Sequence, residues 1–60
     1  MEAFDRLKSL LAEVEDDLAK AEGGNKAAGV RVRKAMQEIK DTAQEIRIKI
    51  LEINKTEEKA

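Results

Sequence analysis

The most constraining feature of the sequence is an apolar residue at every third or fourth position along two segments, interrupted once, at Gly23, Gly24 and Asn25. Alternating spacings of three and four place such residues in one stripe on an α-helix, the heptad seam of a coiled coil. The seam before the interruption consists of Phe4, Leu7, Leu11, Val14, Leu18 and Ala21. The seam after it consists of Val32, Met36, Ile39, Ala43, Ile46, Ile50 and Ile53.

The interruption itself predicts a tight reversal of the chain. Glycine suits the left-handed residue that ends a helix, and asparagine can cap the next one. A single continuous helix is disfavoured, because two glycines in a helix interior would cost about 2 kcal/mol relative to alanine. Residues 46–50 alternate apolar and charged as a strand would, but the chain offers no second strand to pair with them.

These patterns predict an all-α fold, an antiparallel two-helix hairpin resembling a coiled coil. Its expected parts are a helix over residues 2–22, a turn at 23–25, a helix over 26–55 and a frayed C-terminus over 56–60, together one domain spanning 1–60. Gly29, on the seam side of the second helix, is expected to let another helix approach closely.

A hairpin of this size predicts self-association. A domain of about 60 residues buries only about 60% of its unfolded surface, and with no cysteine or histidine in the chain neither a disulfide nor a common metal site can stabilise it. The longer second helix also extends past the first, which leaves large aliphatic side chains uncovered. We therefore expect a homo-oligomeric helical bundle, a dimer or a tetramer. Its predicted interface residues are Leu10, Ile46, Ile48, Ile50, Leu51 and Ile53.

Charge is distributed unevenly although the formal net charge is only −1. Residues 1–22 carry 3 basic and 7 acidic side chains, whereas residues 23–60 carry 9 basic and 6 acidic ones. Beside the seam, antiparallel pairing about Gly24 would set Glu15 near Arg33 and Glu22 near Lys26.

The basic residues that follow the turn are the candidate binding residues. Arginine and lysine that neutralise several phosphates give a salt-sensitive affinity without sequence preference. The candidate DNA contacts are Lys26, Arg31, Arg33 and Lys34, with Lys40 as a weaker fifth. The alternative interpretation is a self-associating coiled-coil module that contacts only protein, since basic residues beside a seam also solvate it or pair between helices.

The stretch GNKAAGVRVRKAMQEIKDTAQEIR from Gly24, together with AEVEDDLAKAEG before it, resembles the chlamydial histone-like family of small bacterial proteins compared with eukaryotic linker histone. The resemblance covers residues 5 to 50, and the lysine-rich tail of the chlamydial members has no counterpart in this sequence. It implies a cytoplasmic, nucleoid-associated protein that binds DNA without strong sequence preference, self-associates, and takes part in DNA condensation and chromosome organisation.

Other classes of function are not expected. No segment approaches the roughly 18 apolar residues of a membrane span. A small helical hairpin offers little cleft for catalysis or for a small-molecule substrate, and the GNKAAG string lacks the spacing of a phosphate-binding loop. We expect no enzymatic activity, no cofactor, no metal and no membrane partner.

Overall fold

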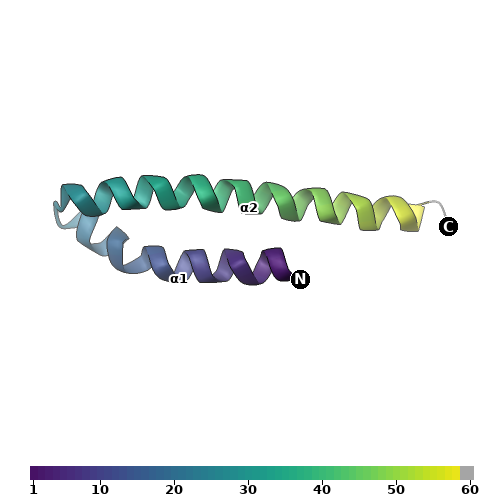
Figure 1. The fold of residues 1–60 in the computed structure, drawn as a ribbon, viewed down its shortest axis with the longest axis horizontal. Coiled ribbons are helices and arrows are strands. Elements are labelled where there is room, and N and C mark those ends of the chain that lie inside the picture. Colours follow the sequence, from purple (N-terminus) through teal and green to yellow (C-terminus); the bar gives the residue numbers. More distant parts are fainter. Residues whose placement is uncertain (59–60) are drawn as a thin grey trace.

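The chain forms two antiparallel helices joined by a tight turn (Figure 1). The structure, a computed structural model, describes residues 1–58 and the side chains of residues 1–55. Helix α1 spans Glu2–Glu22 and helix α2 spans Lys26–Glu58. The predicted all-α hairpin is therefore confirmed. Helix α2 runs past the expected end near residue 55, and the last two residues of the expected frayed end lie outside the described residues.

The turn has the geometry of a Schellman motif. The Asn25 amide donates to the Lys20 carbonyl at 3.0 Å, and the Gly24 amide donates to the Ala21 carbonyl at 3.0 Å. Gly24 has φ 101°, a conformation that side chains resist. Asn25 then caps α2, since its Oδ1 accepts a hydrogen bond of 3.0 Å from the Ala28 amide. Both predicted roles of the turn residues are confirmed.

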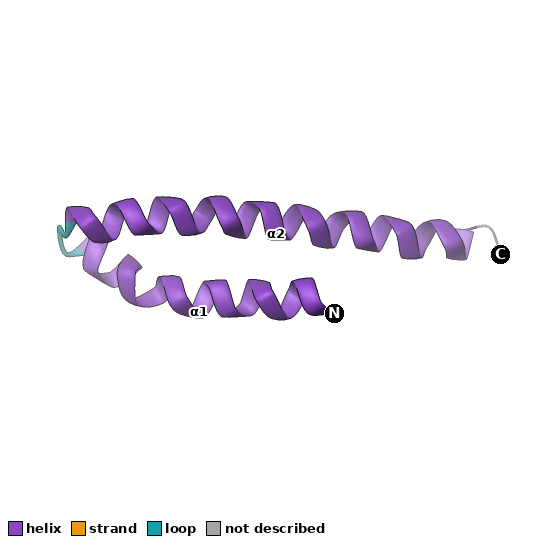
Figure 2. Cartoon of the chain, in the orientation of Figure 1, coloured by secondary structure: helices purple, strands orange, loops and turns teal. Residues whose placement is uncertain are grey.

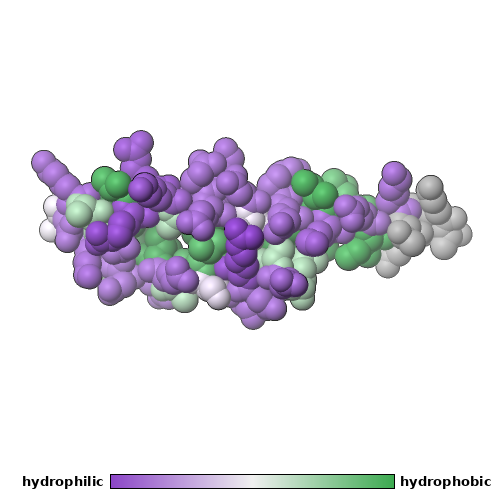
Figure 3. Space-filling view, viewed as in Figure 1, coloured by the Kyte–Doolittle hydropathy of each residue, from purple (hydrophilic) through white to green (hydrophobic). Residues whose placement is uncertain are grey.

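The two helices lie side by side, and α2 extends well past the start of α1 (Figure 2). The molecule is a rod with extents of 53 × 15 × 13 Å. The aliphatic residues of the overhang, Ile48, Ile50, Leu51 and Ile53, are exposed, as expected from the unequal helix lengths. In the space-filling view, apolar green areas lie among charged residues, one of them on the overhanging part of α2 (Figure 3).

The packing between the helices follows the predicted seam only in part. Val14 of the seam is buried, and the half-buried seam residues are Leu7, Ala21, Val32, Ile39, Ala43 and Ile46. The buried apolar residues are Ala3, Val14 and Ala28, and Thr42 is buried with them. Three predicted seam residues of α1, Phe4, Leu11 and Leu18, are exposed instead, as are Met36, Ile50 and Ile53 of α2. In α1, the residues that turn toward α2 precede the exposed ones by one position: Ala3, Leu10 and Asp17.

Small side chains explain this shift. Ala3, Ala28 and Thr42 allow the two backbones to approach, whereas larger side chains would hold the helices apart. The short turn also fixes how the helices are rotated about their own axes. Each helix has an apolar stripe wider than one seam, and the hairpin covers the edge of it on which the small residues lie, together with Val14.

Candidate nucleic-acid interface

An ion pair marks one side of the hairpin and separates Arg31 from the other basic residues. Nη2 of Arg31 lies 3.0 Å from Oδ1 of Asp17 on α1, and Nε of Arg31 donates a hydrogen bond of 3.1 Å to the same oxygen. The hydrogen bond from Arg31 lowers the pKa of the Asp17 carboxyl, the charges of Arg31 and Lys20 lower it further, and burial opposes them. Arg31 is thus held sideways against the acidic helix.

The expected charge pairs beside the seam do not form within the hairpin. Neither Glu15 with Arg33 nor Glu22 with Lys26 is an ion pair among the described residues. The helices are rotated so that Asp17 and Arg31, each seven positions from Gly24, meet instead. The expected pairs are equally symmetric about Gly24, so the spacing alone could not have distinguished the pair that forms. Within α1, Asp16 and Lys20 form an ion pair of 3.5 Å.

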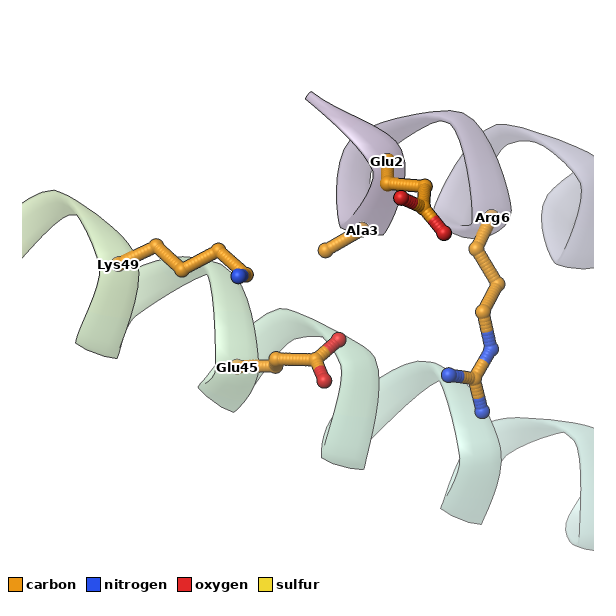
Figure 4. Close-up of a pocket in the computed structure, with 5 residues that line it drawn as sticks. All are labelled: Glu2, Ala3, Arg6, Glu45 and Lys49. Atoms are coloured by element: carbon orange, nitrogen blue, oxygen red, sulfur yellow. The ribbon is translucent and has the colours of Figure 1, made fainter.

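The same side of the hairpin carries a pocket where the first turn of α1 meets α2 (Figure 4). It is lined by Glu2, Ala3, Arg6, Glu45 and Lys49. Figure 4 shows Arg6 extending from α1 toward α2, and Glu45 and Lys49 extending from α2 into the gap. Two carboxylates and two cations face this pocket, so its charges balance. We call the side that holds this pocket and the Arg31–Asp17 pair the polar side.

The outer face of α2, turned away from α1, carries Lys26, Arg33 and Lys34. An α-helix turns by about 100° per residue, so these side chains lie roughly opposite Val32 and Ile39, which are half-buried toward α1. Arg33 and Lys34 line a shallow depression with Val30 and Gln37. Lys40 is exposed at the edge of this face.

The basic residues of the outer face have no acidic partners. In the part of the chain that the structure describes, neither an ion pair nor a side-chain hydrogen bond engages Lys26, Arg33, Lys34 or Lys40. The structure therefore brings three of the five candidate DNA contacts together on one exposed face, with Lys40 beside them. It directs the fifth, Arg31, to a carboxylate on the neighbouring helix.

A third surface is apolar and lies on the side of the hairpin opposite the Arg31–Asp17 pair. On each helix, the residues of this surface are rotated about the helix axis by about 100° from the residues of the polar side. Because the helices are antiparallel, the apolar residues of both helices lie on the same side of the hairpin. We call this surface the apolar face. It consists of Phe4, Leu11 and Leu18 of α1 and Met36, Ala43 and Ile50 of α2.

The predicted oligomer residues are divided among these surfaces. Leu10 and Ile46 are half-buried within the hairpin, and Ile50 belongs to the apolar face. Ile48 and Leu51 lie on the outer side of α2, and Ile53 is exposed on the overhang. Gly29 has open space around it, because an added Cβ would meet nothing within 4 Å. Within the hairpin, the close approach expected at Gly29 is therefore made by Ala28 instead.

Comparison with protein families identifies the chain. The model of the family described as Histone H1-like protein Hc1 matches residues 1–56. The chain belongs to this family. The histone-like resemblance of the sequence is thus confirmed, and for the Hc1 family it extends from Met1, the residue before α1, into the last turns of α2. A search of curated proteins and a search of solved structures each found no match. Within the described residues, neither helix is long and apolar enough to cross a bilayer.

Proposed function

We propose that this chain is a histone-like nucleoid protein that binds DNA without sequence preference through the outer face of α2. The observation that carries the proposal is the group of unpaired cations, Lys26, Arg33 and Lys34, on an exposed helix face of an Hc1 family member. From Lys26 to Lys40 the basic residues extend over about 21 Å at 1.5 Å per residue, or roughly six base pairs of duplex.

The position of the acidic residues supports the same surface. The acidic run over residues 13 to 17 lies on α1, and the outer face of α2 is directed away from that helix. Within one hairpin, phosphates can therefore approach Arg33 and Lys34 without first meeting the carboxylates of residues 13 to 17. No aromatic side chain lies on α2, and the amide of Gln37 beside Arg33 and Lys34 donates to Asp41 at 3.4 Å. Such a surface suits backbone contacts rather than base reading.

Self-association is the second part of the proposal. One short basic face neutralises few phosphates, and joining two copies multiplies the affinity by making the second contact intramolecular. The apolar face also favours a second candidate function, a coiled-coil assembly module that contacts only protein. The two candidates differ in whether a duplex binds.

The test is fluorescence anisotropy of a labelled duplex of about 30 base pairs at about 50 and 200 mM salt. The variant Arg33→Gln/Lys34→Gln removes two cations from the outer face. Its matched control, Arg6→Gln/Lys20→Gln, removes one arginine and one lysine from α1. We expect binding that weakens steeply with salt, a slope smaller by about 2 in the first variant, and a smaller loss in the control.

Two results would contradict the proposal. Equal losses in the two variants would mean that total charge, not the outer face of α2, governs binding. No binding at the lower salt by a helical protein would exclude the DNA function and leave the assembly module.

A further inference from the structure

The hairpin alone exposes more surface than a compact protein of its size. Its accessible surface is 4929 Å², whereas a compact monomer of 6.7 kDa has about 3,900 Å². The excess of about 1,000 Å² is close to the roughly 800 Å² that each partner buries in a standard protein interface. One partner of standard size would therefore remove most of it.

The apolar face has the shape and spacing of half a four-helix bundle. Phe4, Leu11 and Leu18 follow one another at intervals of seven residues, and so do the α2 members of the face. Apart from Ala43, all members of the face are large hydrophobic side chains that the hairpin leaves exposed. Such a regular surface is complementary to another pair of antiparallel helices with the same repeat.

Charges along the two edges of the apolar face indicate which partner covers it. On the α1 edge lie Glu15 and Glu22 with Lys8 in the same row, and on the α2 edge lie Arg33, Lys40 and Arg47. A surface with one acidic and one basic edge complements itself when a twofold axis places α1 of one copy on α2 of the other. If the second copy is instead turned end for end, α1 packs on α1 and α2 packs on α2. The basic edges of the two α2 helices then lie next to each other.

We propose that the apolar face is the interface of a homodimer in which α1 of each copy packs on α2 of the other and both turns lie at the same end. The proposal rests on the self-association included in the proposed function, and it names the face and the orientation. Past the ends of the two α1 helices only the α2 helices remain, and Ile50 and Ile53 of the two copies then face each other.

The pairs expected from the sequence form between the copies in this arrangement. In the register of the hairpin, Glu15 of one copy lies opposite Arg33 of the other, and Glu22 lies opposite Lys26. Lys8 and Lys40 form one unfavourable pair, which Asp5, 3.8 Å from Lys8, offsets. Because such rim pairs are exposed, they set orientation more than affinity. Arginine has five N–H donors, so Arg33 can contact a carboxylate and a phosphate together.

The face is tested with two matched substitutions. Leu11, on the apolar face, is 46% exposed in the hairpin, and Ile48, outside it, is 47% exposed. We expect Leu11→Gln to raise the dimer dissociation constant more than about tenfold, and Ile48→Gln to leave it nearly unchanged, in sedimentation equilibrium. Equal effects of the two variants would overturn the assignment of the face.

The orientation is tested in the otherwise unchanged sequence. The chain has no cysteine, so Ala27→Cys near the turn and Asn54→Cys on the overhang each accept a single dye. Along α2 these positions are roughly 40 Å apart. When donor-labelled and acceptor-labelled copies are mixed, we expect more efficient energy transfer between two copies labelled at 27 than between one labelled at 27 and one at 54. The reverse order would overturn the proposed orientation.

These outcomes are separable from the proposed DNA function. A monomeric wild-type chain in sedimentation would overturn the dimer and the self-association with it, even if the chain binds duplex. A dimer with the expected energy transfer that binds no duplex would uphold the interface and contradict the DNA function. Should Leu11→Gln unfold, the energy-transfer order measured without that substitution still decides the orientation.

Discussion

Arg31 on α2 and Asp17 on α1 share an ion pair of 3.0 Å across the hairpin, in which two guanidinium nitrogens reach the same carboxylate oxygen. The pair fixes the polar side of the molecule. It also withholds one of the five candidate cations from the outer face of α2, where the others are unpaired. Asp17 therefore influences both the hairpin and the charge that is offered to DNA.

The first prediction concerns this competition for Arg31. In Asp17→Asn the arginine loses its charged partner and becomes able to contact phosphate, so we expect tighter duplex binding and a salt slope steeper by about one. Glu13→Gln is the matched control, because it removes the same charge from α1 without releasing Arg31. Anisotropy titrations at several salt concentrations measure both slopes. Identical slopes for the two variants would show that Arg31 does not reach the duplex.

The second prediction concerns acid stability. Arg31 holds the pKa of the folded Asp17 carboxyl below its ordinary value of 3.8. A carboxyl with a lowered pKa contributes stability that is present above pH 3.8 and is lost as the pH falls through the folded value. We expect Asp17→Asn to lose less stability than the wild type below pH 3.8, as measured by urea midpoints on both sides of that pH. Parallel losses would contradict the lowered pKa.

The third prediction concerns Thr42, which is buried between the helices. Its hydroxyl has no hydrogen-bond partner within the described residues. Burying an unpaired polar atom is unfavourable, so Thr42→Val, which keeps the shape and replaces the hydroxyl by a methyl group, should stabilise the hairpin by about 1 kcal/mol. Urea unfolding measures the change, and Thr42→Ala, which removes volume as well, serves for comparison. A loss of stability in Thr42→Val would mean that the hydroxyl is bonded in solution.

The fourth prediction concerns Gly29, which lies in α2 with open space around it. Alanine at this position should stabilise the helix by up to about 1 kcal/mol, because it restricts the unfolded chain and meets no neighbour within the hairpin. Thermal unfolding at several protein concentrations measures the effect. Destabilisation that grows with concentration would show instead that the added methyl group meets a second copy of the chain.

The sequence was sufficient to predict the hairpin but not the rotation of its helices. The heptad spacing predicted both helices, and Gly24 and Asn25 have the predicted conformation and cap. The spacing could not tell which edge of a wide apolar stripe would be buried. Ala3 and Leu10 form one row along α1, and Phe4 and Leu11 form the next. Both rows repeat every seven residues, so the spacing is compatible with burial of either one. The structure resolves this choice through the small residues and the turn.

The candidate DNA contacts show the same limit. Their residue types and their position after the turn indicated a phosphate-binding surface. Residues 31, 33 and 34 are close together in the sequence, however, and point in different directions on a helix. The difference between Arg31, which is paired, and Arg33, which is not, depends on the rotation of the helices and could not be obtained from charge counts.

The overhang of α2 has a consequence for crowding on DNA. The rod is 53 Å long, whereas the basic residues from Lys26 to Lys40 extend over only about 21 Å. A molecule aligned with a duplex would thus cover the length of about fifteen base pairs, while its basic residues would contact about six of them. Protein molecules bound side by side along the duplex would block one another because of their length before the available phosphates were neutralised. A fully occupied duplex would therefore retain most of its negative charge.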